Sequence, residues 1–253
     1  KNGSISKARL DDAVRRILRV KMQIGLLDGK KPHEYKYNFI GAPEHIKIAR
    51  RAVRESLVLL KNNENLLPID PTKHFVIVGD SAQSINSQMG GWTITWQARE
   101  NKNSDYKNVQ NIYSALASNI VNQGGTVEFS RDGSYKKKPD AVIAVYGEEP
   151  YAEGDGDRKD LQFLSKDSTY LKIMESFNTQ EFPIISIFLS GRPLEINKQL
   201  NLSNSFVAAW LPGTAVEGIG DVIFTKNDKV NYDFKGKLSY SWPRYADQNL
   251  NFK

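Results

Sequence analysis

The spacing of apolar residues along this chain changes near residue 75. Before that point apolar side chains recur at helical intervals, which predicts a helix from Ser6 to Ile24 with one apolar face. The residues on that face are Leu10, Ala13, Val14, Ile17, Leu18 and Met22. Ser6 is a suitable N-cap for this helix, and Gly25 is a suitable stop.

A second helix is predicted from about Glu44 to Ser56, again with apolar residues on one face, and it leads into the apolar run from Leu57 to Leu60. The segment between the two helices, residues 28–43, is polar and contains Gly and Pro, so we expect a linker there. The domain proper is expected to cover residues 44–253, and residues 1–27 are expected to be a helix that belongs to a part of the protein upstream of it.

Short apolar runs alternate with helix-length stretches after residue 75. The runs are long enough for strands and occupy residues 75–78, 126–129, 141–145, 184–189 and 206–211. The helix-length stretches occupy residues 109–122, 170–177 and 216–224. This alternation indicates an α/β domain with a mostly parallel sheet sandwiched by helices. Residues 237–242 alternate between polar and apolar and are expected to form a final edge strand.

Composition describes a soluble globular protein and narrows its chemistry. The chain has 253 residues, 40% of them hydrophobic, and no cysteine, which excludes disulfides, thiolate metal sites and cysteine nucleophiles. No run approaches the roughly 18 apolar residues of a membrane span. The first residues lack the apolar segment of an export signal.

The net charge of +6 is concentrated in the first 73 residues, and the remainder carries a small excess of acids. A basic region can bind nucleic acid or a membrane surface. The basic residues here lack interleaved aromatic residues, so we favour amphipathic helices with solvated basic faces and expect no nucleic-acid partner.

An acidic loop, YGEEPYAEGDGDRKD from Tyr146 to Asp160, follows the apolar run 141–145. Folding requires no such crowding of carboxylates, and loops at the carboxyl ends of strands often carry the chemistry of α/β proteins. The acids are Glu148, Glu149, Glu153, Asp155, Asp157 and Asp160. The loop is interpreted as the site of a catalytic carboxylate, with a calcium site and a solvated loop without a role as alternatives.

The calcium alternative is weak. Glu153, Asp155 and Asp157 alternate like the first ligands of an EF-hand loop, but Arg158 stands where that loop needs Gly and Leu164 stands where it needs an acid. The histidines, His33, His45 and His74, show no metal-ligand spacing. We therefore expect no metal and no other cofactor.

Two further motifs lie in loops after predicted strands. In GGWTITWQ, residues 90–97, the glycines allow close approach of a ligand, Trp92 can stack on a sugar ring, and Gln97 can bond hydroxyl groups. Trp96 is expected to be a core residue instead. Arg192, in the SGRP segment after run 184–189, is expected to close the strand end or to bind a carboxylate of the acidic loop.

These stretches together resemble the glycoside hydrolase family 3 β-glucosidases and exo-β-glucanases, and look most like the exo-1,3/1,4-β-glucan branch. The matching pieces keep the family order and cover most of the chain. They are ARLDDAVRRILRVKMQIGLLD, AVRESLVLLKNNENLLPI, GGWTITWQ, YGEEPYAEGDGDRKDL, LSGRP, VAAWLPGT and GKLSYSWP. One departure is Ala98, which stands where the family usually has glycine and bears on the shape of that loop.

The resemblance implies two domains with the active site between them. In the family a TIM-like barrel carries the nucleophilic Asp, and an α/β sandwich of six strands supplies the acid/base Glu. This chain resembles only the sandwich, residues 44–253, and the helix and linker after the barrel, residues 1–43. A barrel, in cis or in trans, is therefore the expected partner, and the parent enzyme is expected to be periplasmic or secreted.

The resemblance places the acid/base at Glu148, with Glu153 as second choice. Crowding by Glu149 and Glu153 is expected to raise the pKa of Glu148, as an acid working near neutral pH requires. The other expected site residues are Trp92 and Gln97 for substrate binding, and Asp157, Arg158 and Arg192 for support of the loop.

Two functions follow from this pattern. The first is the C-terminal domain of a retaining enzyme that removes terminal β-D-glucosyl residues from β-glucan oligosaccharides or from aryl or alkyl β-glucosides. Such a chain would be inactive without the barrel nucleophile. The second is a non-catalytic module that binds β-glucan.

Overall fold

The structure is a computed structural model that describes residues 3–29, 39–164 and 168–248. The chain divides into two compact units, Lys1–His45 and Ile46–Lys253. Part of the predicted linker, residues 30–38, and with it His33, lies outside the described residues.

The first unit holds helix α1 (Lys7–Gln23) and the short 3-10 helix η1 (Leu26–Asp28). The hydroxyl of Ser6 accepts a hydrogen bond from the Arg9 amide, and Gly25 takes the left-handed conformation after the helix, at φ 77°. The predicted helix and both of its end signals are therefore confirmed. The apolar stripe of α1, formed by Leu10, Val14, Leu18 and Met22 among others, is exposed.

The second unit is built on a six-stranded sheet with the order β1-β6-β5-β4-β2-β3. Its strands are β1 (Val58–Asn62), β2 (His74–Val78), β3 (Thr126–Ser130), β4 (Ala141–Gly147), β5 (Ile184–Leu189) and β6 (Ser205–Trp210). Strand β1 runs antiparallel to β6, and every other pairing within this six-stranded sheet is parallel. The predicted mostly parallel α/β sheet is confirmed.

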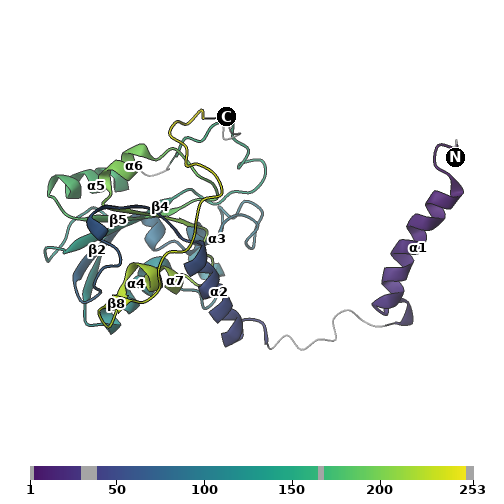
Figure 1. Cartoon of the computed structure of the whole chain (residues 1–253), viewed down its shortest axis with the longest axis horizontal. Helices are drawn as coiled ribbons and strands as arrows, with labels where there is room; N and C mark the ends of the chain where they lie inside the picture. The colour runs from purple at the N-terminus through teal and green to yellow at the C-terminus, as the bar shows by residue number, and fades with distance from the viewer. Residues whose placement is uncertain (1–2, 30–38, 165–167, 249–253) are drawn as a thin grey trace. The chain divides into compact units, whose positions relative to one another are not determined.

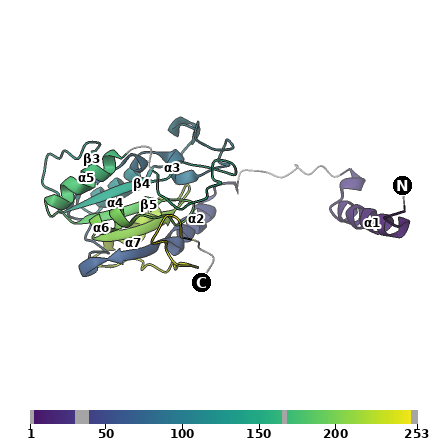
Figure 2. The ribbon, with the colours of Figure 1, turned by 90° about the horizontal axis from the view of Figure 1, so that it is seen from above.

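Helices cover both faces of this sheet (Figures 1 and 2). One face packs against α2 (Pro43–Ser56), α4 (Ile112–Asn122) and α7 (Glu217–Ile223), and the other packs against α5 (Thr169–Thr179) and α6 (Asn197–Leu202). All residues of β2 and β5 are buried, as expected for central parallel strands with covered faces. The short elements are α3 (Ile85–Met89), η3 (Asn63–Asn65), η4 (Asp80–Ala82), η5 (Asn103–Asp105), β7 (Thr225–Lys226) and β8 (Lys229–Val230).

The predicted edge strand at residues 237–242 is wrong, because this segment has no strand structure. The apolar run that begins at Leu57 forms β1 and occupies the edge beside β6. The polar–apolar alternation of 237–242 instead ends in Trp242, whose ring packs against Phe188 and whose Nε1 donates to the carbonyl of Leu194 at 2.7 Å. This segment is therefore held by the docking of Trp242 and not by strand pairing.

The carboxyl ends of the parallel strands meet at one edge of the sheet and bring distant loops together. Gly147, at the end of β4, lies so close to β5 that a Cβ there would clash with the carbonyl oxygen of Leu189. Gly91, in the loop after α3, would clash in the same way with the carbonyl of Tyr151. Loops that follow β2, β4 and β5 therefore share this edge, where open α/β sheets bind their ligands.

Candidate functional site

Gln97 joins the GGWTITWQ loop to the acidic loop. Its Nε2 donates to the carbonyl of Glu153 at 2.8 Å, and its Oε1 accepts from the amide of Ala152 at 2.8 Å. The Gln97 amide, expected to bond sugar hydroxyls, is thus engaged at both ends by the backbone of the acidic loop.

Trp92 joins the same two loops through its side chain. Its Nε1 donates to Oε2 of Glu153 at 2.9 Å, and its ring centroid lies 6.3 Å from that of Trp96. Trp92 is 68% exposed and Trp96 is 51% exposed, so the expectation that Trp96 is a core residue is wrong. Exposed indoles beside a carboxylate form a surface suited to a sugar ring, because each presents an apolar face next to polar groups.

The GGWTITWQ loop and Ala98, the residue after it, also store backbone strain. Trp92, Ile94 and Ala98 have φ values of 59°, 69° and 61°, in the left-handed region that non-glycine residues rarely adopt. The buried Ala98 holds this conformation in the place where the sequence departs from the family pattern. Strain of this kind costs roughly 1–3 kcal/mol per residue and clusters at functional sites.

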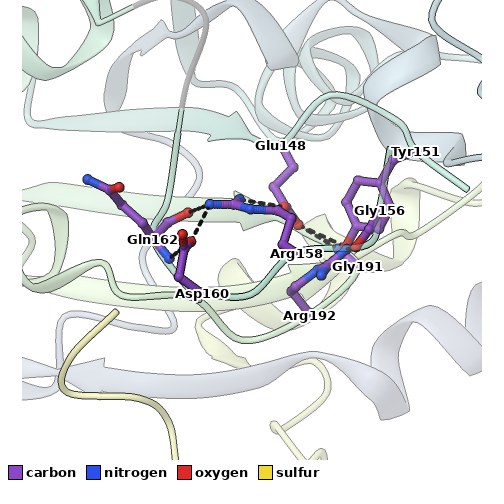
Figure 3. Close-up of polar contacts among 8 residues, drawn as sticks. All are labelled: Glu148, Tyr151, Gly156, Arg158, Asp160, Gln162, Gly191 and Arg192. Atoms are coloured by element: carbon purple, nitrogen blue, oxygen red, sulfur yellow. Dashed lines mark hydrogen bonds and ion pairs between the residues drawn. The ribbon is translucent and has the colours of Figure 1, made fainter. Parts of the chain in front are cut away.

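Glu148 begins the acidic loop and points inward (Figure 3). Its side chain is 8% exposed, and its Oε2 accepts hydrogen bonds from the hydroxyl of Tyr151 at 3.1 Å and from the amide of Gly191 at 3.2 Å. Burial raises the pKa of Glu148, while Arg192, Tyr151, Gly191 and Arg158 oppose the rise. The expected rise is present, but burial causes it, and the charges that act on Glu148 are cationic.

Arg192 holds the acidic loop from the end of β5 (Figure 3). Its Nε donates to the Tyr151 hydroxyl at 2.7 Å, its Nη2 donates to the carbonyl of Gly156 at 2.7 Å, and its guanidinium lies 4.3 Å from the centre of the Tyr151 ring. Tyr151 was not foreseen as a site residue, since an aromatic residue inside a polar loop carries no spacing signal in the sequence.

The remaining acids of the loop are dispersed among separate partners. Asp155 pairs with Arg99 at 2.7 Å, and Asp157 accepts from the amide of Gly154 at 3.2 Å. Arg158 donates to Asp160 and to the carbonyl of Gln162, both at 2.7 Å, while its Nη1 lies 4.0 Å from Glu148. Among the described residues, no group of three or more His, Asp or Glu is arranged to hold a metal ion.

Glu153 contrasts with Glu148 in its access to a ligand. The side chain of Glu153 is exposed and stands at the tryptophan surface. The hydrogen bond from Trp92 is the largest influence on the pKa of Glu153 and lowers it. One carboxylate is therefore buried in the loop's own framework, and the other belongs to an exposed side chain that accepts a hydrogen bond from Trp92.

Comparison with known proteins gives this arrangement a family context. A model of the glycosyl hydrolase family 3 C-terminal domain matches residues 57–253. The chain is 45% identical to an exo-1,3/1,4-β-glucanase from a Pseudoalteromonas species, with a TM-score of 0.90, over 99% of this chain and 32% of that one. It is 27% identical to the periplasmic beta-glucosidase of Salmonella typhimurium, over 98% of this chain and 36% of that protein.

A more distant structure shares the fold. The beta-D-glucoside glucohydrolase from Trichoderma reesei is 21% identical and has a TM-score of 0.71 over 95% of this chain. The chain spans about a third of the length of the relatives that it matches. Among the described residues, no helix is long and apolar enough to cross a membrane.

Proposed function

This chain belongs to glycosyl hydrolase family 3, through the C-terminal domain of that family, and we propose that it is the acid/base half of a retaining β-glucosidase or exo-β-glucanase. The substrate is a β-glucan oligosaccharide or an aryl or alkyl β-glucoside with a terminal β-D-glucosyl residue. Similarity to the Pseudoalteromonas exo-1,3/1,4-β-glucanase at 45% identity supports this substrate class.

The reaction needs a second carboxylate from a facing domain. Retaining glycosidases use a nucleophile and an acid/base about 5–5.5 Å apart. The relatives are about three times longer than this chain, which leaves room for a barrel domain that carries the nucleophile. The isolated chain is accordingly expected to hydrolyse little.

Glu153, the second choice from sequence, is the better acid/base. A general acid must come within hydrogen-bond reach of the glycosidic oxygen. The carboxylate of Glu153 is exposed beside two tryptophans, whereas the side chain of Glu148 is 8% exposed and bonded to Tyr151 and Gly191. This difference in access is the observation that carries the proposal.

The pKa of Glu153 is lowered here, and an acid needs a raised one. The facing domain supplies what is missing: it buries the carboxylate and brings a negatively charged nucleophile close to it. Both effects raise a carboxyl pKa. The enclosure of Glu148 is set by groups of this chain, Tyr151 and Gly191 among them, and a facing domain does not relieve it. The difference in access therefore weighs more than a pKa that the facing domain changes.

The test compares Glu153→Gln with Glu148→Gln in the full-length enzyme. Two substrates are needed: laminaribiose, whose leaving group requires protonation, and 2,4-dinitrophenyl β-glucoside, whose leaving group does not. We expect Glu153→Gln to lower kcat/KM for laminaribiose by about 10²–10⁴-fold. The kcat/KM for 2,4-dinitrophenyl β-glucoside should stay nearly unchanged. The same selective loss in Glu148→Gln, with normal behaviour of Glu153→Gln, would assign the acid to Glu148.

A non-catalytic β-glucan-binding module is the second candidate. The exposure of both Trp92 and Trp96 favours it, because a stacking surface is already present in this chain. It predicts that laminaribiose at millimolar concentration changes the tryptophan fluorescence of the isolated chain. A flat titration counts against it.

A further inference from the structure

We propose that Tyr151 is a positioning residue that fixes the place of Glu153, acting through a hydroxyl group shared between Arg192 and Glu148. This inference rests on the proposed role of Glu153 as acid/base. In this proposal Glu148 stabilises the loop and does not contact the bond that is cleaved.

The Tyr151 hydroxyl has one proton to donate and lone pairs to accept with. Here it accepts from Nε of Arg192 at 2.7 Å and donates to Oε2 of Glu148 at 3.1 Å. Glu148 also accepts from the amide of Gly191, next to Arg192 in the chain. The hydroxyl therefore completes a closed connection between the start of the acidic loop and the end of β5.

Arg192 contacts the loop on both sides of Glu153. Its Nε reaches Tyr151, two residues before Glu153, and its Nη2 reaches the carbonyl of Gly156, three residues after it. One planar guanidinium thus sets the separation of two points that bracket the acid/base (Figure 3). Arginine suits this task because its donors keep a rigid fork geometry.

The ring of Tyr151 is held in place by close backbone. A Cβ at Gly156 would lie 2.6 Å from Cδ2 of Tyr151, and a Cβ at Gly191 would lie 2.5 Å from its hydroxyl oxygen. The guanidinium of Arg192 covers the ring at 4.3 Å. The ring therefore has little room to turn, and its hydroxyl has a defined direction.

Glu153 itself is exposed, and its position depends on the segment that carries it. A displacement of about 1 Å at a reacting group costs on the order of 10²-fold in rate. A buried framework that fixes Tyr151 and Gly156 is the kind of support that a catalytic side chain on a loop requires.

The test uses Tyr151→Phe in the full-length enzyme, with Tyr135→Phe as matched control. Tyr135 donates its hydroxyl hydrogen to Gln180 and lies in the connection between β3 and β4. Tyr151→Phe keeps the ring and removes only the shared hydroxyl. We expect kcat/KM for laminaribiose to fall about tenfold, with little change for 2,4-dinitrophenyl β-glucoside, and amide hydrogen exchange at residues 152–157 to become faster.

Tyr135→Phe should change neither kcat/KM for laminaribiose nor amide hydrogen exchange at residues 152–157. A loss of equal size on both substrates, or unchanged exchange in the loop, overturns the positioning role of Tyr151. If Tyr151→Phe does not fold, Arg192→Lys replaces it, since lysine keeps the charge but cannot hold Tyr151 and Gly156 together. That variant is judged by the same two outcomes.

Failure of the proposed function gives a different result. If Glu153 is not the acid, Glu153→Gln shows no selective loss on laminaribiose. Loop exchange in Tyr151→Phe then still reports on the framework, whichever carboxylate protonates the leaving group. Selective loss in Glu153→Gln without any in Tyr151→Phe overturns the positioning role alone.

Discussion

The indole Nε1 of Trp92 donates a hydrogen bond to Oε2 of Glu153 at 2.9 Å. An N–H directed at a carboxylate stabilises its ionised form, and this bond is the largest influence that lowers the pKa of Glu153. Trp92 therefore orients the proposed acid/base and also sets the pH range in which it keeps its proton.

Trp92→Phe should move the basic limb of the pH profile of kcat/KM to higher pH in the full-length enzyme. Phenylalanine keeps an aromatic face but loses the N–H, so the pKa of Glu153 rises and its protonated form persists further into alkaline solution. Trp210→Phe is the control, because the indole of Trp210 donates to the carbonyl of Ser56 instead. A limb that stays in place, or moves to lower pH, contradicts the role of Trp92.

Gln97→Glu should lower kcat more than it raises KM. The glutamate is nearly isosteric and still accepts from the amide of Ala152, but it cannot donate to the carbonyl of Glu153. If Gln97 bonds the sugar directly, as its sequence context suggested, a rise in KM dominates instead. Steady-state kinetics with laminaribiose separates the two roles.

Asp221→Asn should lower the free energy of unfolding by about 3 kcal/mol. Asp221 is 4% exposed and accepts from Arg50 at 2.7 and 2.6 Å and from Arg54 at 3.0 Å, joining α7 to α2. Asp11→Asn, which breaks the exposed pair with Lys7, should change it by no more than roughly 0.5 kcal/mol. Denaturant unfolding measures both values. Similar losses of unfolding free energy in Asp221→Asn and Asp11→Asn would contradict this prediction.

The same carboxylate gives a pH dependence of known sign. Burial raises the pKa of Asp221, but hydrogen bonds and charges from Arg50 and Arg54 outweigh it, so the pKa lies below its ordinary value. The stabilisation is therefore present above the unfolded pKa of about 3.9 and is lost as the pH falls through the native value. The difference in free energy of unfolding between wild type and Asp221→Asn should shrink in acid.

In Glu148→Gln, the stability difference from wild type should depend on pH with the opposite sign to that expected for Asp221. Burial raises the pKa of Glu148 in the folded protein, so ionisation above the unfolded value of about 4.3 favours unfolding. As the pH rises from about 4 through the native pKa, the variant should gain stability relative to wild type. Glu55→Gln controls for the loss of one negative charge near an exposed partner, Arg51. A variant that loses stability relative to wild type as the pH rises through this range contradicts the burial argument.

The central strands could be predicted from sequence because burial on both faces makes them unbroken apolar runs. The run 184–189 coincides with β5 for this reason. The edge strands of the sheet were harder to predict. Strand β1 pairs with β6, from which it is far apart in sequence. Residues 237–242 alternate like a strand, but they pair with no strand and dock through Trp242. Which segment occupies an edge depends on tertiary contacts that periodicity does not record.

The sequence predicts which loops form the site, but it is less informative about the role of each residue in them. Strand order alone brings the loops that carry Trp92, Glu148 and Arg192 to one edge of the sheet. Whether Glu148 or Glu153 faces outward depends on how the loop turns around Tyr151. A residue from the loop after β5, Arg192, fixes that turn. Both glutamates stand in the same acidic segment, so spacing does not distinguish a buried carboxylate from an accessible one.

Chemical rescue by azide tests the central claim, that Glu153 is the acid/base, most directly. In a retaining enzyme without its acid/base, an activated aryl glucoside still forms the glucosyl-enzyme, and azide attacks it without needing a general base. The full-length Glu153→Ala variant, given 2,4-dinitrophenyl β-glucoside and sodium azide, should regain turnover and release β-glucosyl azide, while Glu148→Ala should not. Formation of β-glucosyl azide by Glu148→Ala and not by Glu153→Ala would contradict the account.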